Sequence, residues 1–509
     1  MKQADSLMQL TRISGVALVL AATHTHAQSP TTRLIGMDEC LQLALQHNLD
    51  VRIQRINPEL AQYTLSGSYG AFDPNLTAGI SRSITSQPAG VDAQGRPYGA
   101  SQNTVDAMNA GVSGRLPTGT RYQLGGPLNE TYGITDLPAY LGGGQQVLDR
   151  SFGQVGISLT QPLLKSFWID TPRMTIAINK KALKQSELGF EYQVIQTITA
   201  VQIAYFNLMA SRENLKVQQK ALQLAQQLYE ENKKRVEVGV LAPLDEKQAE
   251  SQVAASQAQV YLAQGTLVAA ENTLKNLITD SYTTWQDTDL EPSERLAAPV
   301  QVFSRQDSWQ RALTLRPDLL QARLDLEKQH INVRYSFNQL FPELDLTGSY
   351  AQNGSGKEFT DALGVVRDGS NPIYGYGLTL TIPLSNRTAR YNYKMAKAQV
   401  QQSLLTLKKL EQTIMVQVDN DIATARTNLE RVQSTHEATL YAEAALEAEQ
   451  KKLENGKSTS FLVLQAQRDI TQARSTEIGA LTDYNTSIAQ LAQDEGSTLE
   501  RNSINIETR

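Results

Sequence analysis

The sequence predicts a mainly α-helical protein with a membrane β-barrel, built from a duplicated unit of long α-helical hairpins and two β-strands per repeat. Three observations lead to this prediction. The N-terminus has the form of a secretory signal, the same series of landmarks occurs twice in the same order, and the predicted strands alternate apolar with small or polar residues. Alternation with period two is typical of strands, and spacing near 3.5 residues is typical of packed helices.

Residues 1–27 have the charge, length and cleavage site of a signal peptide. Lys2 and Arg12 precede the apolar run ISGVALVLAA, and Thr25 to Ala27 supply small residues for cleavage. No later run reaches 18 consecutive apolar residues, so we expect no transmembrane helix. Any membrane insertion of the mature chain would therefore use β-strands.

Composition excludes several classes of function. The formal net charge of -5 gives no basic surface for nucleic acid. The single cysteine, Cys40, lies in an apolar-periodic segment and is expected to be buried. After the signal peptide only His47, His330 and His436 remain, each isolated, and no phosphate-binding glycine loop is present. We therefore expect no catalytic, cofactor or metal site, and energy for any transport would come from a partner.

The chain contains a duplication. The segment ALQHNLD (44–50) aligns with ALTLRPD (312–318), and an offset of about 268 then places Pro74 on Pro342. Further on, VGISLTQPL aligns with YGLTLTIPL, and Gly239 with Gly456. We expect a signal peptide at 1–27, repeat 1 at 28–280, an equatorial linker at 281–305, repeat 2 at 306–495 and a polar C-terminal tail at 496–509.

The strands are expected at about 72–84, 153–163, 342–352 and 373–384, and proline marks an entry or exit of each at Pro74, Pro162, Pro342 and Pro383. Their alternation fits a barrel with lipid outside and water inside. A half-exposed sheet of a soluble protein gives the same alternation. The signal peptide and the duplication favour the barrel. Four strands cannot close a barrel, so two or three chains would pool about 8 or 12 strands.

Between the first two strands, residues 85–151 form a long glycine-rich excursion. It has the turn chemistry of a further hairpin, with strands near 112–116 and 120–124 around Pro117, Thr118 and Gly119. Whether this hairpin adds strands to the barrel stays open at this point.

The helices supply an argument from length. Segments 171–237 and 388–454 each have about 67 residues and would be about 100 Å long. The returning helix 243–277 is half as long, and we expect 306–338 to complete it. The second returning helix, 459–494, is also half as long, and we expect the N-terminal helix 36–70 to complete it. Each chain would then supply four columns of equal length.

These features together resemble the TolC family of outer-membrane efflux proteins over almost the whole mature chain. The resemblance rests on the duplicated unit, with FDPNL, SLTQPL and RVEVGVLAPLD in the first copy and FPELDL, TLTIPL and KLENGKSTSFLVL in the same order in the second. It implies a homotrimer with a 12-stranded barrel in the outer-membrane lipid and a 12-helix periplasmic tunnel. Such a duct passively conducts substrates from a periplasmic adaptor and an inner-membrane pump to the outside. The alternative is a soluble periplasmic coiled-coil scaffold or adaptor, which also carries long helical hairpins.

The resemblance also implies roles for the two helical breaks. Adaptor-docking tips are implied at Gly239, Val240, Leu241, Ala242, Pro243 and Leu244, and at Gly456, Lys457, Ser458, Thr459 and Ser460. A periplasmic entrance is implied at Asp245, Leu453, Lys457, Leu462 and Gln465.

The entrance departs from the family pattern. Leu462 and Gln465 stand where the family has acidic residues, and Leu453 and Ser458 stand where it has the tyrosine and arginine of its gate. We therefore expect closure through apolar contact at Leu462, together with an Asp245 to Lys457 pair.

Overall fold

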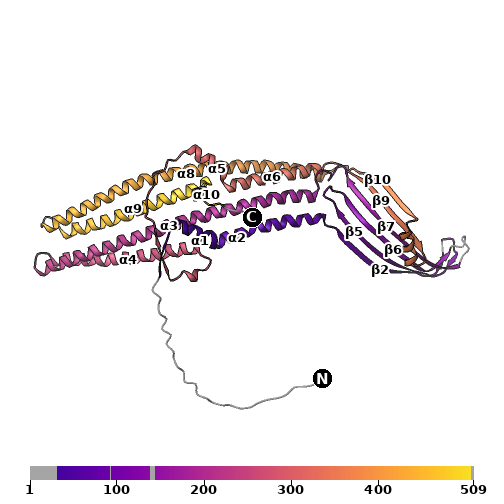
Figure 1. Ribbon diagram of the computed structural model, residues 1–509, viewed down its shortest axis with the longest axis horizontal. Coiled ribbons are helices and arrows are strands. Elements are labelled where there is room, and N and C mark those ends of the chain that lie inside the picture. Colours follow the sequence, from indigo (N-terminus) through magenta and orange to yellow (C-terminus); the bar gives the residue numbers. More distant parts are fainter. Residues whose placement is uncertain (1–30, 92, 138–143, 506–509) are drawn as a thin grey trace, which may run out of the picture.

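The computed structural model describes residues 31–91, 93–137 and 144–505. The predicted signal peptide lies outside these residues. The protein is elongated, with a curved sheet at one end and helical hairpins that extend away from it to the other (Figure 1).

Two unbroken helices run the length of the helical part. They are α3 (Thr171–Glu237) and α8 (Arg387–Glu454), of 67 and 68 residues. The returning helices α4 (Pro243–Ile278) and α9 (Ser460–Glu495) have 36 residues each. Two further segments are each divided into a short and a long helix. They form α1 (Met37–His47) with α2 (Leu49–Ser68), and α5 (Arg305–Leu315) with α6 (Pro317–Asn338).

The half-length helices stack within each repeat, so the expected pairing between repeats is wrong. The Asn48 amide at the start of α2 donates to the Leu277 carbonyl at the end of α4 (3.0 Å). In the second repeat, Arg316 at the start of α6 donates to the Asp494 carbonyl at the end of α9 (3.3 Å). Thus α4 continues into α2, and α9 into α6. Helix lengths alone did not distinguish the two pairings, because all the halves are similar in length.

One sheet of the described residues has six strands, in the order β10-β9-β7-β6-β5-β2, and all neighbours are antiparallel. The strands are β2 (Asn75–Gln87), β5 (Ser101–Arg115), β6 (Arg121–Leu137), β7 (Gly144–Pro162), β9 (Glu343–Gly356) and β10 (Pro372–Thr381). Smaller elements are β1 (Thr31–Ile35) paired with β8 (Thr288–Pro292), β3 (Gly90–Val91) paired with β4 (Pro97–Tyr98), α7 (Phe359–Asp368) and α10 (Thr498–Arg501).

The first repeat contributes four strands to this sheet where the sequence predicted two. The extra pair, β5 and β6, is the hairpin of the 85–151 excursion, and it lies between β2 and β7. Its turn is closed by a hydrogen bond from the Leu116 amide to the Thr120 carbonyl (2.8 Å). Strands β7 and β9 are longer than predicted because glycine and charged residues interrupt their alternation, whereas β2 has the predicted length and β10 is slightly shorter. Proline positions at the strand ends are Pro74 before β2, Pro162 at the end of β7, Pro342 before β9 and Pro383 after β10.

The main core surrounds the middle of α3. Val201, Tyr205 and Leu208 are fully buried there and pack with residues of α1, α4, β1 and β8. Cys40 belongs to this core, and burial raises the pKa of its thiol to about 12. Among the described residues α3 alone meets the length and hydropathy of a membrane-spanning helix, but over half of that apolar window is buried. Its apolar residues thus serve helix packing.

Candidate functional site

Both helical hairpins turn through the same backbone motif at the end far from the sheet. Gly239 has φ +76° and Gly456 has φ +67°, in the left-handed region. The amide after each glycine donates to the carbonyl four residues before the glycine: Val240 to Arg235 (2.8 Å), and Lys457 to Lys452 (2.8 Å). This is the Schellman termination, in which glycine is preferred because it has no Cβ. The repeats therefore end their long helices alike.

The first tip exposes apolar side chains. Val238, Val240 and Leu244 are 74%, 70% and 66% exposed, and α4 begins at Pro243, where the missing amide hydrogen costs little. At the second tip, Phe461 and Leu462 are about half exposed, and Thr459 caps α9. Contiguous exposed apolar groups are typical of interaction surfaces.

A buried asparagine connects the two tips. Asn232 of α3 is fully buried; its Oδ1 accepts from Ser460 Oγ of the second hairpin (2.9 Å), and its Nδ2 donates to the Asp245 carbonyl (3.4 Å). An unpaired buried amide would be costly, so these contacts favour one arrangement of the tips. The sequence analysis missed Asn232. Its spacing of four from buried Leu228 was the available signal.

Of the predicted entrance residues, Leu453 lies in a core. It is 7% exposed and packs with Leu228, Val463 and Leu464 between the two hairpins. Leu462, Gln465 and Lys457 are exposed, and Asp245 is half-buried. Within the described residues of the protomer no ion pair joins Asp245 to Lys457.

The predicted tip residue Ser458 stabilises the second turn. Its hydroxyl donates to Glu449 (2.6 Å), and Lys452 pairs with the same carboxylate (2.5 Å). Hydrogen bonds from Lys452 and then Ser458 hold the pKa of Glu449 below its usual value. The turn therefore stays charged and well hydrated around its apolar tip.

The sheet has one apolar and one polar face. Two cross-strand rows on the apolar face run through the inserted hairpin: Leu76, Val112, Leu124 and Ile157, and Ile80, Met108 and Leu128. The opposite face carries residues such as Thr77, Ser113, Gln123 and Ser158. This division fits strands between lipid and water. Helix α7 packs closely against the apolar face of β9. A Cβ added to Gly354 would lie only 2.0 Å from the carbonyl oxygen of Ala362 in α7.

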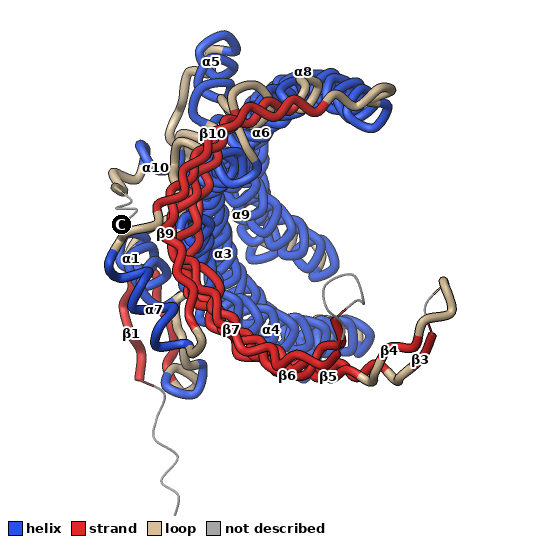
Figure 2. Tube along the Cα trace, turned by 90° about the vertical axis from the view of Figure 1, so that its right-hand side faces the viewer, coloured by secondary structure: helices blue, strands red, loops and turns tan. Residues whose placement is uncertain are grey.

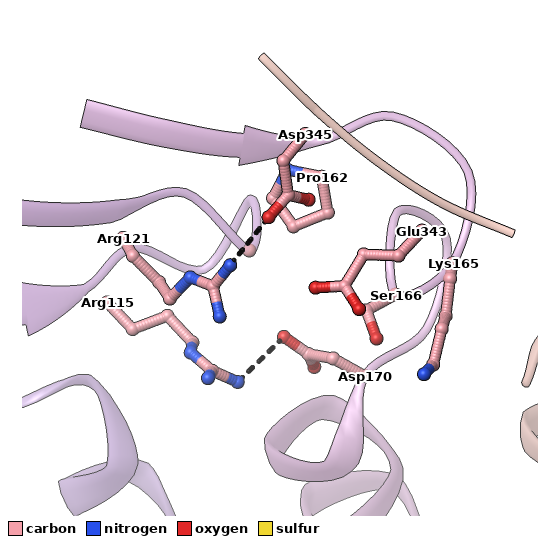
Figure 3. A pocket seen from close by; sticks show the side chains of 9 residues that line it. Arg115, Arg121, Pro162, Lys165, Ser166, Asp170, Glu343 and Asp345 are labelled. Atoms are coloured by element: carbon pink, nitrogen blue, oxygen red, sulfur yellow. Dashed lines mark hydrogen bonds and ion pairs between the residues drawn. The ribbon is translucent and has the colours of Figure 1, made fainter. Parts of the chain in front are cut away.

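Charged residues surround a cavity of about 160 Å³ where the sheet meets the helices (Figure 3). Arg121 of β6 pairs with Asp345 of β9 (2.9 Å), and Arg115 of β5 pairs with Asp170 (3.4 Å). Asp170 caps α3 by accepting from the Arg173 amide (3.0 Å). The turn of the inserted hairpin is thus held by both repeats. None of these residues was singled out from the sequence.

A second polar cluster lies midway along the helices. Asp421 of α8 lies beside Asp494 and Arg316, and Arg316 also pairs with Asp318 (2.8 Å). Burial first, and then Asp494, raise the pKa of Asp421 to about 7. In the described part of the chain no group of three or more His, Cys, Asp or Glu side chains could hold a metal ion.

Comparison with known proteins identifies the family to which these helical hairpins and this sheet belong. The model of the outer membrane efflux protein family matches residues 140–279 and 309–496. The chain belongs to this family. In the efflux protein, the matched segments include β7, α3 and α4 of the first repeat, and β9, β10, α8 and α9 of the second. Strands β2, β5 and β6 precede the first matched segment.

Individual relatives agree with this assignment. The efflux protein is 25% identical over 365 residues to outer membrane protein TolC of Vibrio cholerae, which covers 69% of this chain and 78% of the relative. Its fold is similar to a membrane protein from Pseudomonas aeruginosa (TM-score 0.65, 18% identity, 92% and 91% of the two chains). It is also similar to the CmeC outer membrane channel of Campylobacter jejuni (TM-score 0.64, 16% identity, 93% and 90%).

The efflux protein is therefore an outer-membrane exit duct of a tripartite efflux system, with most of its helical part in the periplasm. Its family consists of transport ducts and is not an enzyme family. Figure 1 shows the sheet and the hairpin tips at opposite ends of the molecule. As the sheet is the membrane part of this outer-membrane duct, the tips lie at its periplasmic end.

Proposed function

We propose that the efflux protein acts as a homotrimer that passively conducts substrates, and that its hairpin tips dock a periplasmic adaptor coupled to an inner-membrane pump. The observation that carries the proposal is the exposed apolar surface at the first tip, formed by Val238, Val240 and Leu244. Apolar groups at the end of a rigid helical pair in water favour a protein partner, since burial would stabilise the contact by about 25 cal/mol per Å².

The docking surface in this proposal comprises 239–244 and 456–460, and the entrance comprises Asp245, Lys457, Leu462 and Gln465. The Asn232 bridge supports a fixed relative position of the two tips, which a docking partner would require. The burial of Leu453 supports a structural role for this residue, beneath the entrance. The pump supplies the energy and selects the cargo.

The test replaces the exposed apolar groups with charge. We expect Val240→Asp and Leu244→Asp to abolish efflux in the native host while the protein still reaches the outer membrane as a trimer. The matched control is Lys220→Asp, an exposed position on α3 away from the tip, which keeps efflux. Normal efflux by both tip variants would disprove the docking role. A monomeric mass in detergent would disprove the trimer.

A further inference from the structure

We infer that each protomer supplies six strands to the barrel wall, so that the trimer closes an 18-stranded barrel in which β10 of one protomer pairs with β2 of the next. The inference rests on the trimer proposed above. It differs from the 12 strands that the family resemblance implies, because the β5–β6 hairpin becomes part of the wall.

The free edges of the sheet fit this closure. Strand β2 is exposed at all 13 positions, and β10 exposes Tyr374, Tyr376 and Leu378 on the apolar face. Long exposed edges are templates for pairing with another chain. The strands alternate in direction across the sheet, so β10 and β2 at its two edges run antiparallel to each other. A second copy of this chain is therefore the partner that both edges fit.

The inserted hairpin has the length and pattern of a membrane-crossing pair. Asp106, which pairs with Arg82 (2.6 Å), and Arg115 at the turn are nine positions apart on β5. About 9 to 11 residues cross a bilayer as a tilted strand. Between these charges Met108 and Val112 lie on the apolar face and continue its rows from β2 to β6. If the hairpin lay in water, these rows would be exposed to it.

Ion pairs hold the turn of the hairpin at the boundary between sheet and helices. The contacts of Arg115 with Asp170 and of Arg121 with Asp345 fasten it to the head of α3 and to β9 (Figure 3). A hairpin that folded out of the wall would leave Asp170, which is 4% exposed on its side chain, without Arg115. The turn is therefore fixed in register with its neighbours.

The width of the helical layer matches the width of a six-stranded sheet. Six strands spaced about 4.8 Å apart and tilted by about 40° span about 38 Å of arc. Four helical columns spaced about 10 Å apart span about 40 Å. Four strands would span only about 25 Å. Seen along the long axis, the sheet and the helices follow a common curve (Figure 2). The barrel thus matches the tunnel in circumference.

The consequence is a wide exit. Barrel diameter grows roughly linearly with strand number, so 18 strands give about 1.5 times the diameter of 12, and barrels of this size enclose an aqueous channel. Small and polar residues such as Thr77, Ser113 and Ser158 would line it. We expect the membrane part to be no narrower than the periplasmic tunnel.

Cysteine labelling tests whether the hairpin lies in the wall. Val112 pairs with Leu124 on the apolar face, and their neighbours Ser113 and Gln123 pair on the polar face at the same depth. We expect a water-soluble maleimide to modify Ser113→Cys and Gln123→Cys and to spare Val112→Cys and Leu124→Cys in outer membranes. A lipid-soluble maleimide should show the reverse preference. The native Cys40 is fully buried and gives little background.

Equal labelling of all four variants by the water-soluble reagent would overturn the inference. Electron microscopy of the wild-type protein in detergent, with its mass measured on the same sample, is the second test and needs no substitution. A trimer with 18 strands supports the inference, and a trimer with 12 overturns it while the proposed function stands. A mass other than that of a trimer overturns both the proposed assembly and the 18-stranded closure.

Discussion

Asn232 accepts a hydrogen bond from Ser460, 228 positions further along the chain, and so fastens the first helical hairpin to the second close to their tips. The same side chain donates to the Asp245 carbonyl within its own hairpin. One buried amide thus joins three of the four helix ends at the tips, those of α3, α4 and α9.

Removing this amide should loosen the entrance. We expect Asn232→Ala to leave the Ser460 hydroxyl unpaired at a cost of about 1–3 kcal/mol per protomer and to raise single-channel conductance in planar bilayers. The control is Ser458→Ala, which loses a hydrogen bond inside the second hairpin only. If both variants conduct like the wild type, Asn232 does not hold the entrance closed.

A charge at Leu462 should change ion selectivity. Leu462 is half exposed beside the second tip, and a trimer with Leu462→Asp would carry three added carboxylates at the proposed entrance. We expect the cation-to-anion permeability ratio to rise several-fold, measured as reversal potential in a salt gradient, since carboxylate rings favour cations. Leu440→Asp, on α8 away from the tip, should leave the ratio unchanged. Unaltered conductance and selectivity in Leu462→Asp would remove this residue from the entrance.

Stability should depend on pH through Asp421. Burial and Asp494 raise its pKa in the folded state from 3.8 to about 7, so the folded protein holds a proton that the unfolded chain releases. Stability from this group is therefore present below pH 4 and is lost as pH rises through about 7. We expect Asp421→Asn to be more stable than the wild type at pH 8, by on the order of 2 kcal/mol per chain, and similar to it at pH 4.

Thermal unfolding of the detergent-solubilised protein at the two pH values provides the measurement. Asp483→Asn, which breaks an exposed ion pair with Arg431, serves as the control and should show no such pH dependence. A constant difference between Asp421→Asn and the wild type across this range would contradict the assignment.

The two ion pairs at the base of the sheet should differ in importance. Asp170 is nearly fully buried, caps α3 and pairs with two arginines, whereas the Arg121 to Asp345 pair is partly exposed. We expect Asp170→Ala to destabilise the assembly by about 3 kcal/mol, and Arg121→Ala by about 1 kcal/mol or less. The temperature at which the assembly dissociates in SDS gives the ranking. Equal effects of the two substitutions would contradict the greater contribution of Asp170.

The helical framework was predictable because glycine and apolar spacing determine it locally. The ends of α3 matched the prediction, since Asp170 and Gly239 are local termination signals. The pairing of the half-helices was not predictable. It depends on contacts such as Asn48 with Leu277, which join residues far apart in the chain.

Strands β5 and β6 were only partly predictable. Gly125, Gly126 and Pro127 interrupt the apolar alternation of β6, and Asp106 stands in the apolar face of β5. Strand β6 keeps its register with β5 through these residues, while its pairing with β7 is interrupted at Gly126 and Pro127. The carboxylate of Asp106 is paired by Arg82. The entrance was the least predictable part, because Asn232 has its partner on a different hairpin.

The contacts of Asn48 and Arg316 join the half-length helices end to end, and helices α4 and α9 could tilt about these joints. Helices α4 and α9 extend about 54 Å from these joints to the tips, so a tilt of about 5° there would move each tip by about 5 Å. Helices α3 and α8 have no corresponding joint and would have to bend or rotate as whole rods. A small tilt at mid-height would therefore be amplified into a larger displacement at the tips.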